Sequence, residues 1–478
     1  MNGALVALEA QVRAEFAKTA HPGAAWLAPK LDPDGRPALD VLVIGAGQSG
    51  IATAFGLMRS QVTNILVLDK AEEGREGPWL TYARMHTLRS PKDFTGPDLD
   101  IPSLTYQSWH EAQFGEDDWR SIDLIPRELW AEYLLWFRRV VDLPVRNGCE
   151  VVEVLPAAGG LLAAKVQTAA GIDTLFVRKI VLTTGSGGHG RLDNSRDAAP
   201  SAVVDLRAYG ATDRLRQLTR QTDCSDRCRR LGVRQCRDGT GGRRGGGASV
   251  LPQGGHPGDP ALPLAHLSRL PDHFCDLDDA WRWRFMRAIL EMREGFPQAT
   301  YGRCARHANF HRHDGAPIEA AREAGRGVEL QTPRGVFPAD FVICGTGVDM
   351  NFAGRPELQN CAANIAVWAD RYQPPTDERS PRLGRFPYLA DDYALMERVA
   401  GETPWIADIH VFAIASTMSF GPSGSSINAM TTAVSKLVHG PTRGLFRADI
   451  ERHWASFRAY DVPQAVVERQ TPAMGDGR

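Results

Sequence analysis

Three glycines with the spacing Gly45-x-Gly47-x-x-Gly50 are of the kind that holds the pyrophosphate of a dinucleotide. In this pattern the first glycine makes a tight turn, the second lets the backbone approach the phosphates, and the third lets a helix pack closely on a strand. Asp69 lies farther along, at the end of an apolar run, where its carboxylate could accept a hydrogen bond from a ribose hydroxyl. The chemistry indicated is the binding of FAD or NAD, since the same pattern serves both.

The residues around this motif predict the elements that would position it. An apolar strand, DVLVI, begins at Asp40, and an Ala- and Leu-rich helix follows the glycines as far as Ser60. A second strand, NILVLD, ends at Asp69. The helix would direct the N–H groups of its first turn at the phosphates. A glycine turn without a ligand is the alternative, and the order of strand, helix and acid makes it the weaker one.

Hydrophobic spacing predicts further elements. An N-terminal helix outside the main fold is indicated by Leu5, Val6, Leu8, Val12 and Phe16, and a Pro/Gly-rich connector follows up to Pro37. The segments GCEVVEVLP, AAKVQTA and DTLFVRKIVLTTG predict a strand meander that ends in a buried strand at residues 180–184. The segment ADFVICGTGVDMNF repeats this pattern of an apolar strand followed by Thr-Gly. The two segments are therefore expected to have related roles in one fold.

Composition excludes several classes of partner. The chain has 478 residues, which favours two or three domains, and its 55 basic and 57 acidic side chains give a formal charge of -2. Such a balance provides no strong field for nucleic acid or an anionic membrane, so a small-molecule partner is predicted. No apolar run is long enough for a membrane span and no signal peptide is recognisable, which predicts a cytoplasmic protein. The 8 cysteines show no paired framework, and disulfides are not expected.

Three histidines lie close together in the sequence, at His307, His311 and His313. They invite a metal interpretation, because imidazole is a common zinc ligand. No carboxylate or cysteine stands at a recognisable ligand spacing from them. No metal site is predicted.

The motifs together resemble the two-dinucleotide flavoprotein monooxygenases, which include flavin-containing monooxygenases, Baeyer–Villiger enzymes and N-hydroxylases. Besides the glycine motif, Gly77-Pro-Trp79 is similar to the family's Gly-Gly-x-Trp segment beside the flavin, with proline in place of the second glycine. The remaining matching segments are MHTLRSPK (85–92), IPRELWAEYLLWF (125–137), TTGSGGHG (183–190), ICGTG (343–347) and FGPSGSSINAMTTAV (420–434). The resemblance covers most of the chain except a central stretch.

This resemblance implies an α/β fold, with a three-layer Rossmann-like FAD-binding domain into which a second Rossmann-like domain for NADPH is inserted. It divides the chain into an N-terminal helix and connector (1–38), a first part of the FAD domain (39–190), the NADPH domain (191–335) and a second part of the FAD domain (336–478). In such proteins the chain leaves and re-enters the FAD domain at two crossings. Here these would be the segments that contain Gly185 and Gly345.

The resemblance also implies which residues bind the cofactors. They are Gly45, Gly47, Gln48, Ser49, Gly50, Asp69, Lys70, Trp79, His86, Gly185, Gly345, Thr346, Gly347 and Asn428. Asn428 would lie near the isoalloxazine ring. An ordinary core aromatic is an equal alternative for Trp79, and a plain surface or core histidine is the default for His86.

The function implied is that of a monooxygenase that uses FAD, NADPH and O₂ to oxidise a small molecule. Since the chemistry of such an enzyme belongs largely to the cofactor, no catalytic side chain is assigned. A flavin-binding remnant without catalysis and a dehydrogenase with a single NAD-binding unit stay open, although the second leaves residues 345–347 unexplained. A disulfide reductase is disfavoured, because it needs Cys-x-x-Cys and the nearest pair is Cys224 and Cys228. The substrate, the atom oxidised and the oligomeric state are not predicted.

The central stretch, residues 191–270, is where a second βαβ unit for NADPH is required. It contains no Lys, Glu, Ile, Met, Phe or Trp, although the chain has 18 Phe, 11 Trp and 10 Met. A segment of this composition cannot build a normal core. Its glycines, including Gly239 and Gly241, follow no apolar strand and are not a nucleotide motif.

Translation out of frame explains both the missing motif and the composition. Codons for residues 220–242 can be chosen so that translation one nucleotide later yields GKRTALIGAGASAFDNAATALEA, which is a strand, a Gly-x-Gly turn and a helix. A basic linker is the plain alternative, although such insertions are usually richer in Lys, Glu and Ser. A zinc site of Cys224, Cys228 and Cys236 is another alternative, but it lacks a fourth ligand. The hypothesis predicts FAD binding with little or no turnover driven by NADPH.

Overall fold

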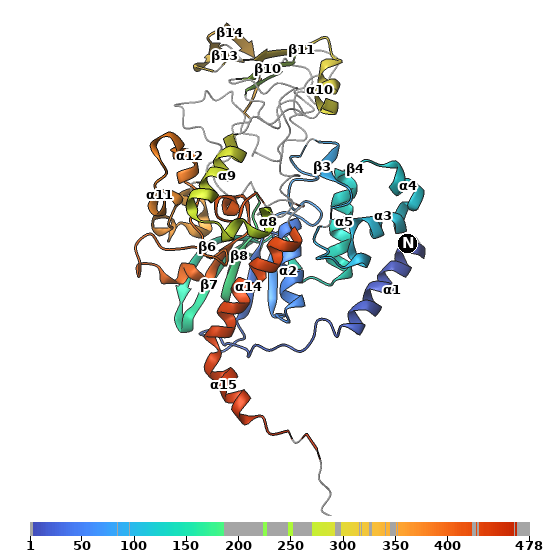
Figure 1. Ribbon diagram of the computed structural model, residues 1–478, viewed down its shortest axis with the longest axis vertical. Coiled ribbons are helices and arrows are strands. Elements are labelled where there is room, and N and C mark those ends of the chain that lie inside the picture. Colours follow the sequence, from blue (N-terminus) through green and yellow to red (C-terminus); the bar gives the residue numbers. More distant parts are fainter. Residues whose placement is uncertain are drawn as a thin grey trace, which may run out of the picture.

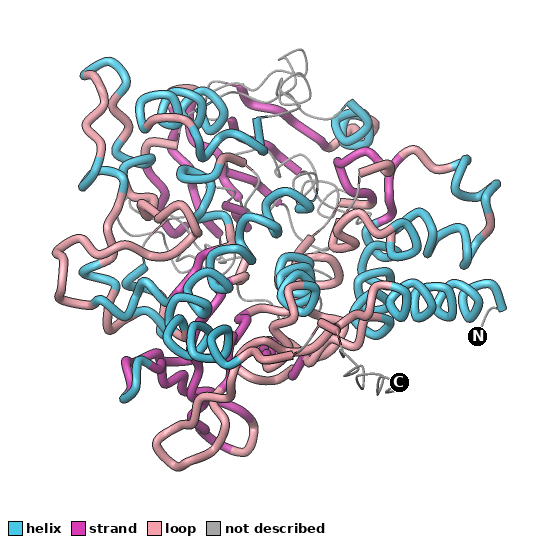
Figure 2. The backbone as a smooth tube through the Cα atoms, turned by 60° about the horizontal axis from the view of Figure 1, so that its bottom comes forward, coloured by secondary structure: helices cyan, strands magenta, loops and turns pink. Residues whose placement is uncertain are grey.

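The structure is a computed structural model. It describes residues 3–83, 85–94, 96–185, 223–226, 247–251, 270–291, 298–314, 316, 318–324, 327–339, 341–344, 350, 352–422, 427, 430–462 and 464–465. The described elements form a mixed α/β fold, in which helices (cyan) cover the strands (magenta) of parallel sheets (Figure 2). The predicted α/β class is confirmed.

The first sheet contains seven strands, and its parallel part has the order β5-β2-β1-β8. These strands are β1 (Leu39–Ile44), β2 (Ile65–Leu68), β5 (Val145–Arg146) and β8 (Gly171–Leu182), and β16 (Ile409–Val411) pairs with β8 in parallel. The strands β6 (Glu150–Ala157) and β7 (Leu161–Thr168) continue the sheet as an antiparallel meander into β8. Apart from Asp40, β1 is apolar, because strands inside a parallel sheet are covered on both faces. The predicted meander is confirmed.

Helices from both ends of the chain pack around this sheet. The helix α2 (Gln48–Arg59) lies against α14 (Met430–Ala448), and a Cβ on Gly56 would meet Val438 at 2.9 Å. The helices α5 (Arg127–Val140), α3 (Tyr106–Phe114) and α4 (Glu116–Ser121) lie on another side, with α3 and α4 outermost (Figure 1). The predicted N-terminal helix, α1 (Gly3–Lys18), packs on α3 through Leu5, Leu8 and Val12. The segment 85–92 contains the strand β3 (Thr87–Pro91), which pairs with β4 (Leu124–Pro126).

A second sheet of four strands has the order β11-β10-β9-β15, and all of its pairs are parallel. Its strands are β9 (Asp223–Asp226), β10 (Gly247–Leu251), β11 (Phe310–Asp314) and β15 (Phe341–Cys344). An antiparallel sheet lies near it, formed by β12 (Ala320–Ala324), β13 (Gly327–Thr332) and β14 (Gly335–Ala339) (Figure 1). In both parallel sheets the strands stand in the order third, second, first, fourth along the chain. The two units therefore share one topology.

The remaining helices lie mostly in the C-terminal half. They are α8 (Leu270–His273), α9 (Asp279–Glu291), α10 (Gln298–Ala305), α11 (Trp368–Arg371), α12 (Pro381–Gly384), α13 (Thr417–Phe420) and α15 (Ile450–Ala459). Short 3₁₀ helices occupy Pro102–Leu104, Ala158–Gly160, Phe274–Asp276, Phe352–Gly354, Pro356–Leu358, Ala362–Asn364, Thr376–Glu378, Pro404–Asp408 and Ile414–Ser416. Within the described residues, no helix combines the length and the apolar character that crossing a membrane requires.

A buried ion-pair cluster fastens the first sheet to the C-terminal helices. Arg178 on β8 is only 4% exposed, and its guanidinium lies 3.2 Å from Asp40 and 2.8 Å from Asp449, the residue between α14 and α15. Burial raises the pKa of Asp40 although Arg178 acts in the opposite direction. A buried charge cluster of this kind costs much free energy when one partner is removed.

Candidate dinucleotide site

The glycine turn is sterically locked at two of its three glycines. Gly45 has a φ of 107°, and a Cβ there would lie 2.7 Å from the carbonyl oxygen of Thr183. A Cβ on Gly50 would lie 1.8 Å from the carbonyl oxygen of Gly45. The hydroxyl of Thr183 donates to the carbonyl oxygens of Ile44 and Gly45, at 2.9 and 2.7 Å. The end of β8 therefore holds the turn in place.

Gly47 has a different environment. It is the N-cap of α2, in an extended conformation, and the nearest atom to a Cβ placed there is Gly77 Cα at 3.8 Å. The described part of the chain therefore gives no steric reason for a glycine at this position. A glycine is needed here if a ligand approaches the backbone closely at the helix N-terminus. A pyrophosphate bound there would accept hydrogen bonds from the N–H groups of the first turn of α2.

Asp69 stands beside the turn, as predicted. Its two carboxylate oxygens accept hydrogen bonds from the backbone N–H groups of Ala46, at 2.7 Å, and Ala71, at 2.8 Å. The carboxylate thus supports the turn directly, and lone pairs remain on both oxygens for a ribose hydroxyl. The neighbouring Lys70 is exposed and pairs with Glu150 at 3.2 Å.

The other predicted residues differ in their surroundings. Trp79 is buried near the turn, and a Cβ on Gly77 would lie 3.9 Å from both Trp79 Cδ1 and Gly47 Cα. His86 is exposed, and its carbonyl oxygen accepts a hydrogen bond from the N–H of Arg127. Gly185 follows β8 with a φ of 62°, and Ser49 is buried in the first turn of α2. The residues outside the described part of the chain are Gly345, Thr346, Gly347 and Asn428.

Two contacts at the site were not predicted. The indole N–H of Trp130, on α5, donates to the side-chain oxygen of Gln48 at 3.3 Å. Arg355 is 2% exposed, and its guanidinium donates to the hydroxyl of Thr184 at 3.0 Å and pairs with Glu357. Because Arg355 and Thr184 are far apart in the sequence, only the fold brings these two residues together. A buried arginine next to the second crossing carried no local signal.

The residues present fit FAD on two independent observations. A Cβ on Gly47, at the N-terminus of a helix, would make only ordinary contact with Gly77, and the indole nitrogen of Trp79 is buried without a hydrogen-bond partner among the described residues. A buried polar atom of this kind usually has a partner. A bound dinucleotide would supply acceptor oxygens within this region.

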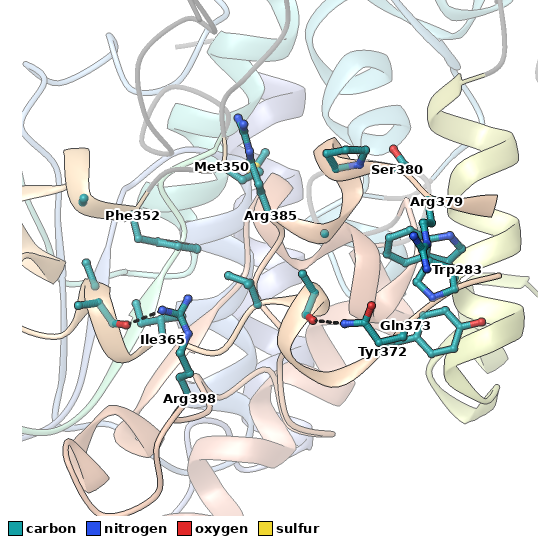
Figure 3. Close-up of a pocket in the computed structure, with 18 of the residues that line it drawn as sticks. Trp283, Met350, Phe352, Ile365, Tyr372, Gln373, Arg379, Ser380, Arg385 and Arg398 are labelled. Atoms are coloured by element: carbon teal, nitrogen blue, oxygen red, sulfur yellow. Dashed lines mark hydrogen bonds between the residues drawn. The ribbon is translucent and has the colours of Figure 1, made fainter. Parts of the chain in front are cut away.

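A separate cavity of about 910 Å³ is lined by Trp283 and by residues that follow the second crossing in the sequence (Figure 3). Met350 and Phe352, which lie in the same segment as Arg355, form part of its lining. Aromatic and cationic side chains line it, among them Trp283, Tyr372, Arg379, Arg385 and Arg398. Aromatic faces stack on planar rings. Arg398 pairs with Asp370 at 3.0 Å, so Arg379 and Arg385 are the guanidinium groups of the lining that an anionic molecule could meet.

The fold and the site define an α/β protein that binds dinucleotides, and comparison with known proteins narrows this class. Residues 42–187 match the family model described as FAD-NAD(P)-binding. The chain is 33% identical to the FAD-dependent urate hydroxylase of Xanthomonas campestris pv. campestris over 482 residues, which covers 98% of each chain. The chain therefore belongs to the flavoprotein monooxygenase family.

Solved structures show the same fold at low sequence identity. The ornithine N-hydroxylase of Kutzneria sp. 744 superposes with a TM-score of 0.63 at 15% identity, over 85% of this chain and all of that one. The ornithine hydroxylase of Pseudomonas aeruginosa gives 0.64 at 16% identity, over 86% of this chain and 99% of that one. The protein is an FAD-dependent monooxygenase that acts on a small molecule, and the family model it matches is one that binds FAD and NAD(P). The function predicted from the sequence is confirmed at this level.

Proposed function

We propose that the small molecule oxidised by this monooxygenase is urate or a closely related oxidised purine. The observation that carries the proposal is the 33% identity to a urate hydroxylase over 98% of both chains. The cavity lined by Trp283 supports it, because urate is flat and anionic at neutral pH and the lining offers aromatic rings and arginines. Arg355 lies in the same segment as Met350 and Phe352 of the cavity wall, and its guanidinium donates to the hydroxyl of Thr184, next to the glycine turn. This hydrogen bond links the cavity wall to the proposed flavin site.

A single-turnover experiment tests the substrate without depending on NADPH. The FAD-loaded chain is reduced without oxygen by a stoichiometric amount of dithionite and then mixed with O₂ and urate. We expect urate to be consumed in proportion to flavin, and xanthine, which lacks the oxygen at C8, to remain unchanged. Reoxidation of the flavin with no loss of urate would contradict the proposal.

We propose the residues that hold FAD from the same geometry. Gly45 and Gly50 shape the turn, Gly47 admits the pyrophosphate, and the N–H groups of Gln48 and Ser49 face it. The carboxylate of Asp69 accepts a hydrogen bond from a ribose hydroxyl, and Trp79 lies beside the cofactor. When FAD is bound it supplies the redox chemistry, and the protein orients it and excludes water. The proposed domains remain 39–190 and 336–478 for FAD and 191–335 for NADPH.

We also propose that residues 191–270 are out of frame. Most of them lie outside the described residues, but the strand β9 is described and occupies the first-strand position of the second parallel sheet. Its sequence is DCSD, whereas the shifted frame places TALI at these positions, directly before GAG. An apolar strand followed by Gly-x-Gly is what the first position of a dinucleotide-binding sheet requires.

Independent sequencing of the DNA across codons 185–280 tests this directly. We expect compensating insertions or deletions on both sides of the central stretch. The near-complete coverage of the urate hydroxylase, 98% of each chain, agrees with a shift that is later restored, because the overall length is preserved. An unchanged DNA sequence would contradict the hypothesis and favour a flavin protein that has lost its NADPH unit.

A further inference from the structure

The helix α15, near the C-terminus, carries an exposed apolar stripe. Ile450, Trp454 and Phe457 recur at the spacing i, i+4, i+7, which places them on one face of the helix. Their exposed fractions are 46%, 57% and 72%. Tyr460 and Val462, which follow the helix, are exposed at 68% and 57%. Scattered exposed apolar residues are ordinary on a protein surface, but a group of large ones on one element marks a contact surface.

The rest of the molecule gives this helix little support. Figure 1 shows α15 extending from the end of α14 away from the sheets, and none of its residues is buried within the described part of the chain. Its first turn is held, because Arg452 donates to the carbonyl oxygen of Trp26 at 3.1 Å. The ring of His453 also stacks on that of Phe446, with centroids 4.6 Å apart. A helix of 10 residues is marginal in water by itself, so the second half of α15 is expected to need a partner.

The charged residues beside the stripe identify that partner. Glu451 and Arg458 lie on the same flank of the stripe, two helical turns apart, which is about 10 Å along the axis. At this distance they do not pair within one helix, and among the described residues neither forms an ion pair. The guanidinium of Arg458 lies over the ring of Trp454, at 6.0 Å from its centroid. One flank thus presents an acid and then a base, a pattern that is complementary to itself when reversed.

A second copy of α15 satisfies this pattern when the two helices run antiparallel. The same flank of both helices then meets, so Glu451 of one copy lies near Arg458 of the other, and the reverse. Trp454 of each copy packs on Phe457 of the other. A parallel pair would instead bring Arg458 toward His453 on the opposite flank of the other copy and would leave Glu451 without a cation. The charges therefore favour the antiparallel pair.

The area of the stripe sets the strength of the contact. The helix is about 15 Å long, and Trp454, Phe457 and Tyr460 together expose about 300–500 Å². A stable interface buries about 800 Å² on each partner, so this surface suits a contact at the low end of the range. The pairing is therefore expected to be reversible and to depend on concentration.

We propose that the apolar stripe of α15 is a self-association surface, through which two copies of this chain form a weak dimer of antiparallel helices. The occupant is a second copy because the acid and the base stand on one flank in the order that pairs with itself. The proposal does not depend on the substrate, since it concerns a surface outside the proposed flavin and urate sites.

Sedimentation velocity of the FAD-loaded full chain at a series of concentrations tests the dimer. We expect the sedimenting species to shift, as the concentration rises, from one chain to about twice that mass. The variant Trp454→Glu should remain monomeric throughout the series. Trp281→Glu is the matched control, because Trp281 is 51% exposed on the helix α9, and it should dimerise as the unchanged chain does.

Exchange of the two charges distinguishes a second copy from other partners. Glu451→Arg and Arg458→Glu should each weaken the dimer, since each places like charges against one another across the antiparallel pair. The double variant restores opposite charges and should dimerise as the unchanged chain does. A double variant no better than the single ones would overturn the proposal. A chain that stays monomeric at every concentration would also overturn it, and binding of that monomer to phosphatidylserine vesicles would assign the stripe to a membrane instead.

Discussion

The two parallel sheets have the same strand order and very different sequences at their first strands. In the first sheet β1 has the sequence LDVLVI, which is apolar apart from Asp40, and the glycine turn follows it directly. In the second sheet β9 has the sequence DCSD, and residues 227–246 after it lie outside the described residues. Both strands pair in parallel with a neighbour on each side.

This difference shows that the strand order and the binding of a cofactor depend on different residues of the chain. Strand order is built from backbone hydrogen bonds, which any residue except proline can make. Cofactor binding depends on particular residues at the first turn, and in the first sheet these are fixed by Gly45, Gly50, Thr183 and Asp69. A shared strand order alone therefore does not make the second sheet a nucleotide site.

The largest effect is expected from Gly50→Ala, which would break the first sheet's turn. The added methyl group would overlap the carbonyl oxygen of Gly45, and backbone cannot move aside as a flexible side chain can. We expect the free energy of unfolding to fall by about 4 kcal/mol or more and flavin binding to be lost. Urea unfolding and flavin absorbance measure both.

Gly47→Ala is the matched control for that variant. Its methyl group meets nothing closer than 3.8 Å, so we expect the fold to survive and flavin affinity alone to fall. If the Gly47→Ala protein binds flavin as well as the unchanged chain does, no ligand approaches this turn closely. The first sheet would then be no better supported as a cofactor site than the second sheet.

The next largest effect is expected from Arg178→Leu, which isolates the first sheet from the C-terminal helices. The change leaves the buried carboxylate of Asp40 without its cation. We expect the free energy of unfolding to fall by about 3–4 kcal/mol. The exposed pair of Arg120 and Glu116 is the control, and Arg120→Ala should cost less than about 1 kcal/mol. Equal effects of the two changes in urea unfolding would contradict the assigned role of Arg178.

A smaller effect is expected on the stability of the first sheet at acidic pH, through a histidine on the strand β16. His410 on β16 is buried, and burial lowers its pKa from 6.5 to about 4. The unfolded chain takes up the proton near 6.5 and the folded chain only near 4, so the free energy of unfolding falls on acidification through this range, by at most about 3 kcal/mol. Urea unfolding at about pH 7 and about pH 5 measures the loss, and His410→Gln should reduce it. An identical pH dependence in both proteins would exclude this histidine as the cause.

The sequence was sufficient to predict β1, β2 and the meander of β6, β7 and β8, because each of these strands carries a local signal, whereas the short strands β5 and β16 were not predicted. The apolar strand before Gly45, the glycine spacing and the acid at Asp69 lie within one short segment. The contact of Arg355 with Thr184 and that of Trp130 with Gln48 join distant segments, and no local pattern marks them. The strand β9 could not be predicted, because DCSD contains no β-branched or aromatic residue and has Asp, which strands disfavour, at both ends, so that only its neighbours in the sheet define it.

The most direct test of the difference between the two sheets is anaerobic reduction of the bound flavin by NADPH, followed by absorbance, with dithionite as the control reductant. A complete first sheet and a scrambled second unit predict that dithionite bleaches the flavin whereas NADPH does so very slowly or not at all. Rapid bleaching by NADPH would contradict this account and would show that the chain as written contains a working NADPH site.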